Sequence, residues 1–73
     1  MNIEHLVRMA NDIGAFFAAE PSGEAAARAV LNHIKRFWDP RMRREMAEHF
    51  RAGGAGLDEP ARSAVALLVA EQK

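Results

Sequence analysis

The sequence predicts an all-α fold, a small bundle of four short helices, and three observations support this prediction. Apolar residues recur every three or four positions along most of the chain, which is the period of an amphipathic helix. No segment of strand length alternates apolar and polar residues. Residues that favour helix ends separate the apolar stripes from one another. Because the chain has 73 residues, we expect a single helical domain over residues 1–73.

The first helix is expected to begin after Asn2, whose side chain can cap it. It should end near Ala19, because Pro21 disfavours helical geometry at the residue before it. Gly14 lies on the apolar stripe, where it lowers helix propensity by about 1 kcal/mol relative to Ala. Its expected use is the close approach of another helix. The apolar residues are Ile3, Leu6, Val7, Ala10, Ile13, Gly14 and Phe17, with Met9 and Phe16 beside them.

The second helix is expected to begin at the cap Ser22, with Glu24 in the first turn, where the helix dipole favours an acid. Its apolar stripe consists of Ala27, Val30, Leu31, Ile34 and either Phe37 or Trp38.

The third helix should follow at once, because Asp39 is a good N-cap and Pro40 loses no needed hydrogen bond at the first helical position. Gly53 and Gly54 should end it, since glycine readily adopts the left-handed conformation found after helices. Its apolar stripe consists of Met42, Met46 and Phe50.

Asp58 is expected to cap a fourth helix, with Pro60 in its first turn. The expected inner face consists of Ala61, Ala64, Val65 and Leu68, flanked by Leu67 and Val69. The four helices could hide some of this apolar surface among themselves, and whether a patch remains to bind a partner stays open.

Composition excludes several classes of protein. Ten basic and ten acidic residues give a net charge of zero, which argues against a general nucleic-acid binder. The chain has no cysteine, and no two histidines are spaced to hold zinc on one helical face. Neither a signal peptide nor a membrane span is predicted, so we expect a cytoplasmic protein. No cofactor or catalytic group is indicated, because "AGGAG" (52–56) lacks the Lys and Ser or Thr of a phosphate loop.

A basic segment breaks the usual rule for helix starts. A cation in the first turn costs about 0.3–1 kcal/mol, yet Arg41, Arg43 and Arg44 stand together after Pro40. Such a start can attract a phosphate, a carboxylate or an acidic protein surface, or it can be a solvated face. Trp38 can likewise be an interface anchor or a core residue at a helix end.

Three blocks of this sequence together resemble one family. "LVRMANDIGAFF" (6–17), "HIKRFWDPRMRREM" (33–46) and "GLDEPARSAV" (56–65) occur in this order. The chain closely resembles the delta subunit of soluble NAD-dependent, molybdenum-containing formate dehydrogenases, and "FWDPRMR" (37–43) is the most specific part of the match.

This resemblance implies an accessory, non-catalytic subunit without a redox centre. Its implied partner is the large catalytic (alpha) subunit, which holds a bis-pyranopterin guanine dinucleotide molybdenum cofactor and iron–sulfur clusters. The implied role is to support cofactor insertion or assembly. As alternatives to this function, the chain could be a small helical module that binds an anion or nucleic acid through the basic start of the third helix. The isolated chain could also form a homo-oligomer. The residues that we expect to bind the partner are Phe37, Trp38, Asp39, Pro40, Arg41, Met42, Arg43 and Arg44.

Overall fold

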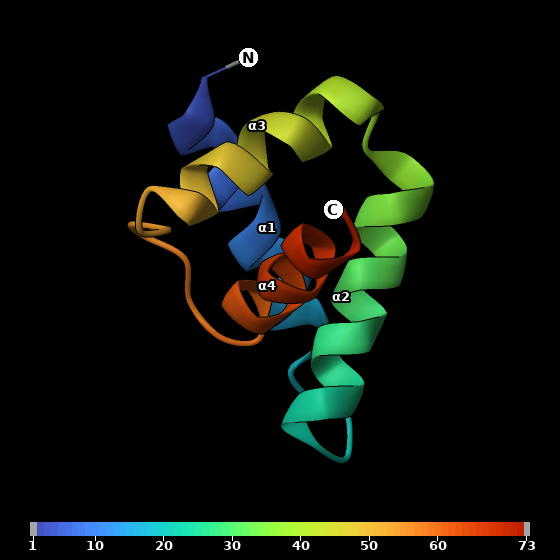
Figure 1. Cartoon of the computed structure of the whole chain (residues 1–73). Coiled ribbons are helices and arrows are strands. Elements are labelled where there is room, and N and C mark those ends of the chain that lie inside the picture. Colours follow the sequence, from blue (N-terminus) through green and yellow to red (C-terminus); the bar gives the residue numbers. More distant parts are fainter. Residues whose placement is uncertain (1, 73) are drawn as a thin grey trace.

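The computed structural model describes residues 2–72 and confirms the all-α prediction. It contains α1 (Ile3–Phe17), α2 (Gly23–Phe37), α3 (Pro40–Arg51) and α4 (Ala61–Glu71). In Figure 1, α2 runs along one side of the molecule and α3 crosses its top, while α4 lies in front of α1. Each of α1, α2 and α3 packs against α4.

Short polar side chains begin the first three helices, as predicted. The Asn2 side chain accepts a hydrogen bond from the Glu4 amide at 2.7 Å. The Ser22 hydroxyl accepts one from the Ala25 amide at 3.0 Å, so it satisfies a donor that the helix itself leaves unpaired. The first helix ends at Phe17, two residues before the predicted end.

The start of α4 differs from the prediction. The helix begins at Ala61 with Pro60 as the N-cap residue, so Pro60 lies just before the first turn and Asp58 is not the cap. Instead, the Glu59 carboxylate accepts hydrogen bonds from the amide and the hydroxyl of Ser63, at 3.3 and 2.5 Å. The amide of Asp58 donates to the Asn11 side chain at 2.9 Å, which ties this loop to α1.

The turn after α3 confirms that glycine ends this helix. Gly53 and Gly54 have φ angles of 124° and 65°, in the range that favours glycine. Their amides donate to the carbonyls of Phe50 and His49, at 3.0 and 2.9 Å, in the pattern of a Schellman motif. The Arg62 guanidinium then donates to both glycine carbonyls, at 3.0 and 3.1 Å, so α4 holds the turn in place.

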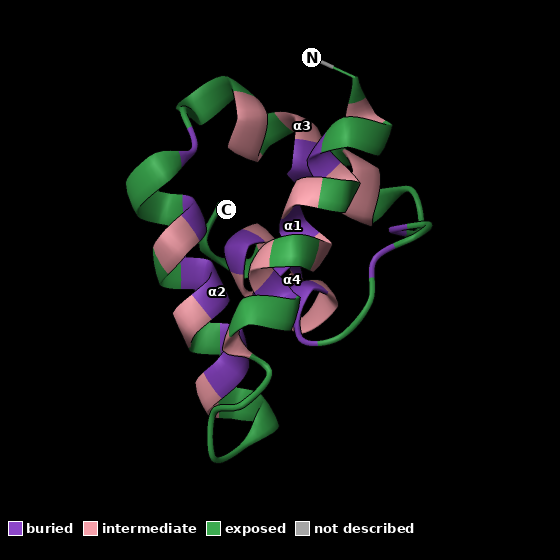
Figure 2. Ribbon diagram, turned by 180° about the vertical axis from the view of Figure 1, so that it is seen from behind, coloured by how far each residue is buried: buried purple, intermediate pink, exposed green. Residues whose placement is uncertain are grey.

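One hydrophobic core lies between the four helices, and Figure 2 shows their buried faces turned inward. Burying one of its larger aliphatic side chains stabilises the fold by about 1.5–3 kcal/mol. The fully buried large side chains are Leu6, Val30, Ile34, Met46 and Val65.

Gly14 allows α1 and α4 to approach closely, as predicted. A Cβ atom at this position would lie 3.2 Å from the Ala61 nitrogen and 3.3 Å from the Pro60 Cδ. Glycine therefore allows α1 to pack closely against the start of α4, although glycine has a lower helix propensity than alanine. Among the described residues, no helix is long and apolar enough to cross a membrane.

Candidate partner-binding site

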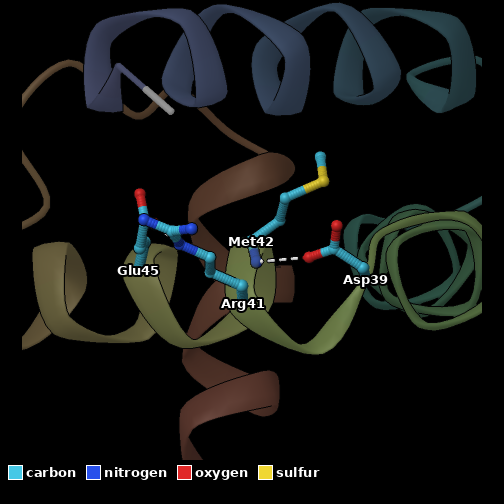
Figure 3. A network of polar contacts seen from close by, with 4 residues as sticks. All are labelled: Asp39, Arg41, Met42 and Glu45. Carbon is cyan, nitrogen blue, oxygen red and sulfur yellow. Dashed lines mark hydrogen bonds and ion pairs between the residues drawn. The ribbon is translucent and has the colours of Figure 1, made fainter.

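The junction between α2 and α3 is held by Asp39 and Pro40. The Asp39 carboxylate accepts a hydrogen bond from the Met42 amide at 2.9 Å, and Pro40 occupies the first helical position. Both roles were predicted from the sequence. In Figure 3, the Met42 side chain points toward α1, and it packs against the core while remaining half-buried. The junction therefore holds the following basic turn in a defined position.

Trp38 is a core residue and not an exposed anchor. Only 5% of it is exposed, and it belongs to the core cluster with Ile34 and Met46. Its backbone amide donates to the Ile34 carbonyl at 2.9 Å, which closes the last turn of α2. A direct contact between this indole and a partner would require the junction to open.

The arginines of α3 differ in their surroundings. Arg41 is exposed and pairs with Glu45 at 3.2 Å (Figure 3), in the order with the cation first, which is the weaker one. Because the Arg41 side chain is 77% exposed, this pair contributes little to stability. No ion pair joins Arg44 to Glu48 within the part of the chain that the structure describes, although their spacing would allow one.

Arg43 and Arg44 lie beside the carboxyl end of α4. Together with Pro40 and Gln72, they line an open hollow on the surface. The first turn of α3 itself has no acidic residue, and the Asp39 carboxylate that caps the helix offsets part of the positive charge at this end. This corner can bind an anionic group or an acidic surface on another protein.

Phe37 belongs to a different surface. It is 67% exposed, and its ring lies 4.7 Å from the ring of His33. The His33 ring lies 6.3 Å from that of Phe17, which in turn contacts Phe16 edge to face at 5.0 Å. We call these four residues the aromatic surface: Phe16, Phe17, His33 and Phe37.

The sequence pattern did not predict this aromatic surface as a unit. It indicated Phe16 beside the stripe of the first helix, and it left open whether Phe37 or Trp38 faces the core. The structure resolves that choice in favour of Trp38, and it leaves Phe16 exposed at 78%. The excess of apolar residues on the first helix did indicate an exposed apolar surface. That Phe16 and Phe17 lie near His33, however, depends on how α1 and α2 cross.

The structure therefore separates the predicted binding segment into parts. Phe37 faces the aromatic surface, Trp38 and Met42 pack inward, and Arg43 and Arg44 face the hollow by α4. Within residues 2–72, no group of three His, Cys, Asp or Glu side chains is placed to hold a metal ion.

Comparison with known families returned one match. Residues 5–65 match the family model of the NADH-dependent formate dehydrogenase delta subunit FdsD, so the matched region includes most of α1, all of α2 and α3, and the start of α4. No curated protein and no solved structure matches the chain.

Proposed function

Because this chain belongs to the family of NADH-dependent formate dehydrogenase delta subunits, we propose that it is a non-catalytic subunit that binds the catalytic (alpha) subunit. In this role it supports insertion of the molybdenum cofactor or assembly of the enzyme complex. The observation that carries the proposal is the family match over residues 5–65, which covers α2 and α3 in full and most of α1. We also infer that the chain works in the cytoplasm, where an enzyme that uses NADH finds its cofactor.

The proposed binding segment is the predicted one, Phe37 to Arg44, with different tasks for different residues. Trp38, Asp39 and Met42 hold the junction, through burial and the 2.9 Å cap hydrogen bond. Arg43 and Arg44 would then contact the partner without first having to be ordered. A preformed surface loses less conformational entropy on binding, which favours affinity. The remaining contact residues in this proposal are Phe37, Pro40 and Arg41.

Charge supports an acidic patch on the catalytic subunit as the counterpart of this segment. Three arginines at a helix start, with only Arg41 held by an ion pair within α3, form a local positive field on a chain whose net charge is zero. Complementary charge at an interface speeds association and selects the orientation of the partners. Binding through this segment should therefore weaken as salt concentration rises.

A second candidate function is binding of a phosphate group, for example that of the pterin dinucleotide during cofactor insertion. The hollow lined by Pro40, Arg43, Arg44 and Gln72 favours it, since arginine pairs with phosphate through two parallel hydrogen bonds. Titration with guanine nucleotides should then shift the NMR signals of Arg43 and Arg44. Unchanged spectra at millimolar nucleotide would rule this candidate out.

The proposed function is tested by preparing formate dehydrogenase from cells with and without this chain. We expect the enzyme made without it to hold less molybdenum, to have lower activity, or to lack intact complex. Full molybdenum content and full activity in an intact complex would contradict the assembly role. Returning the chain on a plasmid is the control that ties any defect to its absence.

A further inference from the structure

The aromatic surface carries the exposed large hydrophobic side chains of the described residues. Phe16 and Phe37 are the two large hydrophobic residues that remain exposed, at 78% and 67%. The Arg36 guanidinium lies 5.7 Å from the centre of the Phe37 ring and covers only part of it. Exposed aromatic groups of this kind are typical of the centres of interfaces between proteins.

Two shallow hollows meet on this surface and share part of their lining. Phe17 and His33 line both hollows, so they lie at the middle. Phe16 and Asp12 line the hollow on the α1 side, while Phe37 and Arg36 line the one on the α2 side. The ring contacts run from Phe16 through Phe17 and His33 to Phe37, with Asp12 in the hollow that contains Phe16 and Arg36 in the hollow that contains Phe37.

The two charges in these hollows are available for a partner. Neither Asp12 nor Arg36 forms an ion pair with another described residue, although Arg36 lies over the Phe37 ring. A surface with opposite charges at its two ends is complementary to a copy of itself turned by 180°. Such a two-fold arrangement is the commonest symmetry of protein dimers.

We propose that the aromatic surface binds a second copy of this chain, with the two-fold axis near Phe17 and His33. In this pairing, Phe16 of each copy meets Phe37 of the other. Asp12 of each copy meets Arg36 of the other, so that two ion pairs form at the edges of an aromatic centre. The central ring pairs of the two copies lie against each other across the axis.

The proposal goes beyond the proposed function, because it shares only Phe37 with the proposed binding segment, and the charges that test it, Asp12 and Arg36, lie outside that segment. None of Arg41, Arg43 and Arg44 lines either hollow of the aromatic surface. Binding to formate dehydrogenase and pairing of two copies can therefore succeed or fail separately. The aromatic surface is small, and interfaces that bury less than about 1,200 Å² in total are typical of weak or transient complexes. We expect a dimer that dissociates on dilution.

Charge reversal tests this pairing on the full chain. The variants Asp12→Arg and Arg36→Asp each place like charges opposite one another twice, so each should raise the dimer dissociation constant about tenfold or more. An equimolar mixture of the two variants restores opposite charges at both edges, and it should associate as the wild type does. Sedimentation equilibrium measures the association, and NMR spectra recorded on dilution should show shifts at Phe16, His33 and Phe37.

Matched controls keep the charge changes and move them off the surface. Glu4→Arg and Arg28→Asp alter exposed residues on the same two helices, and they should leave self-association unchanged. Circular dichroism of every variant checks that the helices remain folded. A wild-type chain that stays monomeric at all concentrations overturns the proposal. So does a mixture that fails to associate, or a dimer that neither single reversal weakens. Loss of formate dehydrogenase binding in Asp12→Arg, without wild-type self-association, would assign the surface to that enzyme instead.

Discussion

Phe37 and Trp38 are neighbours in sequence, but they lie on opposite sides of the boundary between core and surface. Trp38 is 5% exposed and closes the last turn of α2, whereas Phe37 is 67% exposed on the aromatic surface. Two adjacent aromatic side chains at a helix end thus have different tasks. One stabilises the fold, and the other is available for contacts with another molecule.

This difference predicts unequal effects of truncation. Trp38→Ala should lower the free energy of unfolding by about 3–5 kcal/mol, because it leaves a cavity in the core. Phe37→Ala is the matched control, and it should change stability by no more than about 0.5 kcal/mol, as exposed substitutions usually do. Urea denaturation of the two variants measures both values. Equal losses would show that the two side chains are buried to a similar extent.

The two aspartates before helices should also differ. Asp39→Ala removes the hydrogen bond to the Met42 amide and should cost about 1 kcal/mol of stability. Asp58→Ala should be close to neutral, because the Asp58 carboxylate does not cap α4. Thermal melts followed by circular dichroism would compare them. A larger loss for Asp58→Ala would restore the capping role that the sequence suggested.

Enlarging Gly14 should push α1 and α4 apart. Gly14→Val places atoms against the Ala61 backbone and Pro60, so we expect a loss of about 1–3 kcal/mol from overpacking. Gly23→Ala is the control, since a Cβ atom there meets nothing within 4 Å. Chemical denaturation of both variants tests this. If Gly14→Val were as stable as the wild type, the two helices would not be in close contact.

Asn11 should hold the loop before α4 from a distance of more than forty residues in sequence. Its side chain donates to the Gly56 carbonyl and accepts from the Asp58 amide, both at 2.9 Å. Asn11→Ala should therefore cost about 1–2 kcal/mol and speed amide hydrogen exchange in the loop. Asn32→Ala, at an exposed position on α2, is the control. Unchanged exchange at Asp58 in the Asn11 variant would contradict this role.

The sequence predicted those features that depend on neighbouring residues. The caps at Asn2, Ser22 and Asp39 act over two or three positions, so their residue types suffice to locate the helix starts. The glycine turn after α3 is equally local. The apolar stripes followed from the helical period, and they identified most of the core.

Features that depend on tertiary contacts were predicted less well. The start of α4 was placed at Asp58, but Pro60 is the N-cap residue, Asn11 binds the Asp58 amide, and the Glu59 carboxylate accepts from the Ser63 amide, which no local pattern reveals. The aromatic surface escaped notice because it combines side chains from α1 and α2. The predicted binding segment likewise includes residues that the fold turns in different directions. Its role in binding remains a prediction.

The central claim is that this chain binds the catalytic subunit of formate dehydrogenase through the basic start of α3. The most direct test uses the tagged chain as bait in extract of its native cells, with mass spectrometry to identify what it retains. We expect the wild type to retain the large molybdenum and iron–sulfur subunit. The variant Arg43→Glu/Arg44→Glu should retain at least about tenfold less, because two favourable charges become repulsive.

The control is Arg8→Glu/Arg28→Glu, which makes the same change in charge on α1 and α2 and should bind as the wild type does. Failure of the wild-type chain to retain the catalytic subunit would contradict the claim of partnership. Equal retention by all three chains would contradict the proposed role of the α3 arginines.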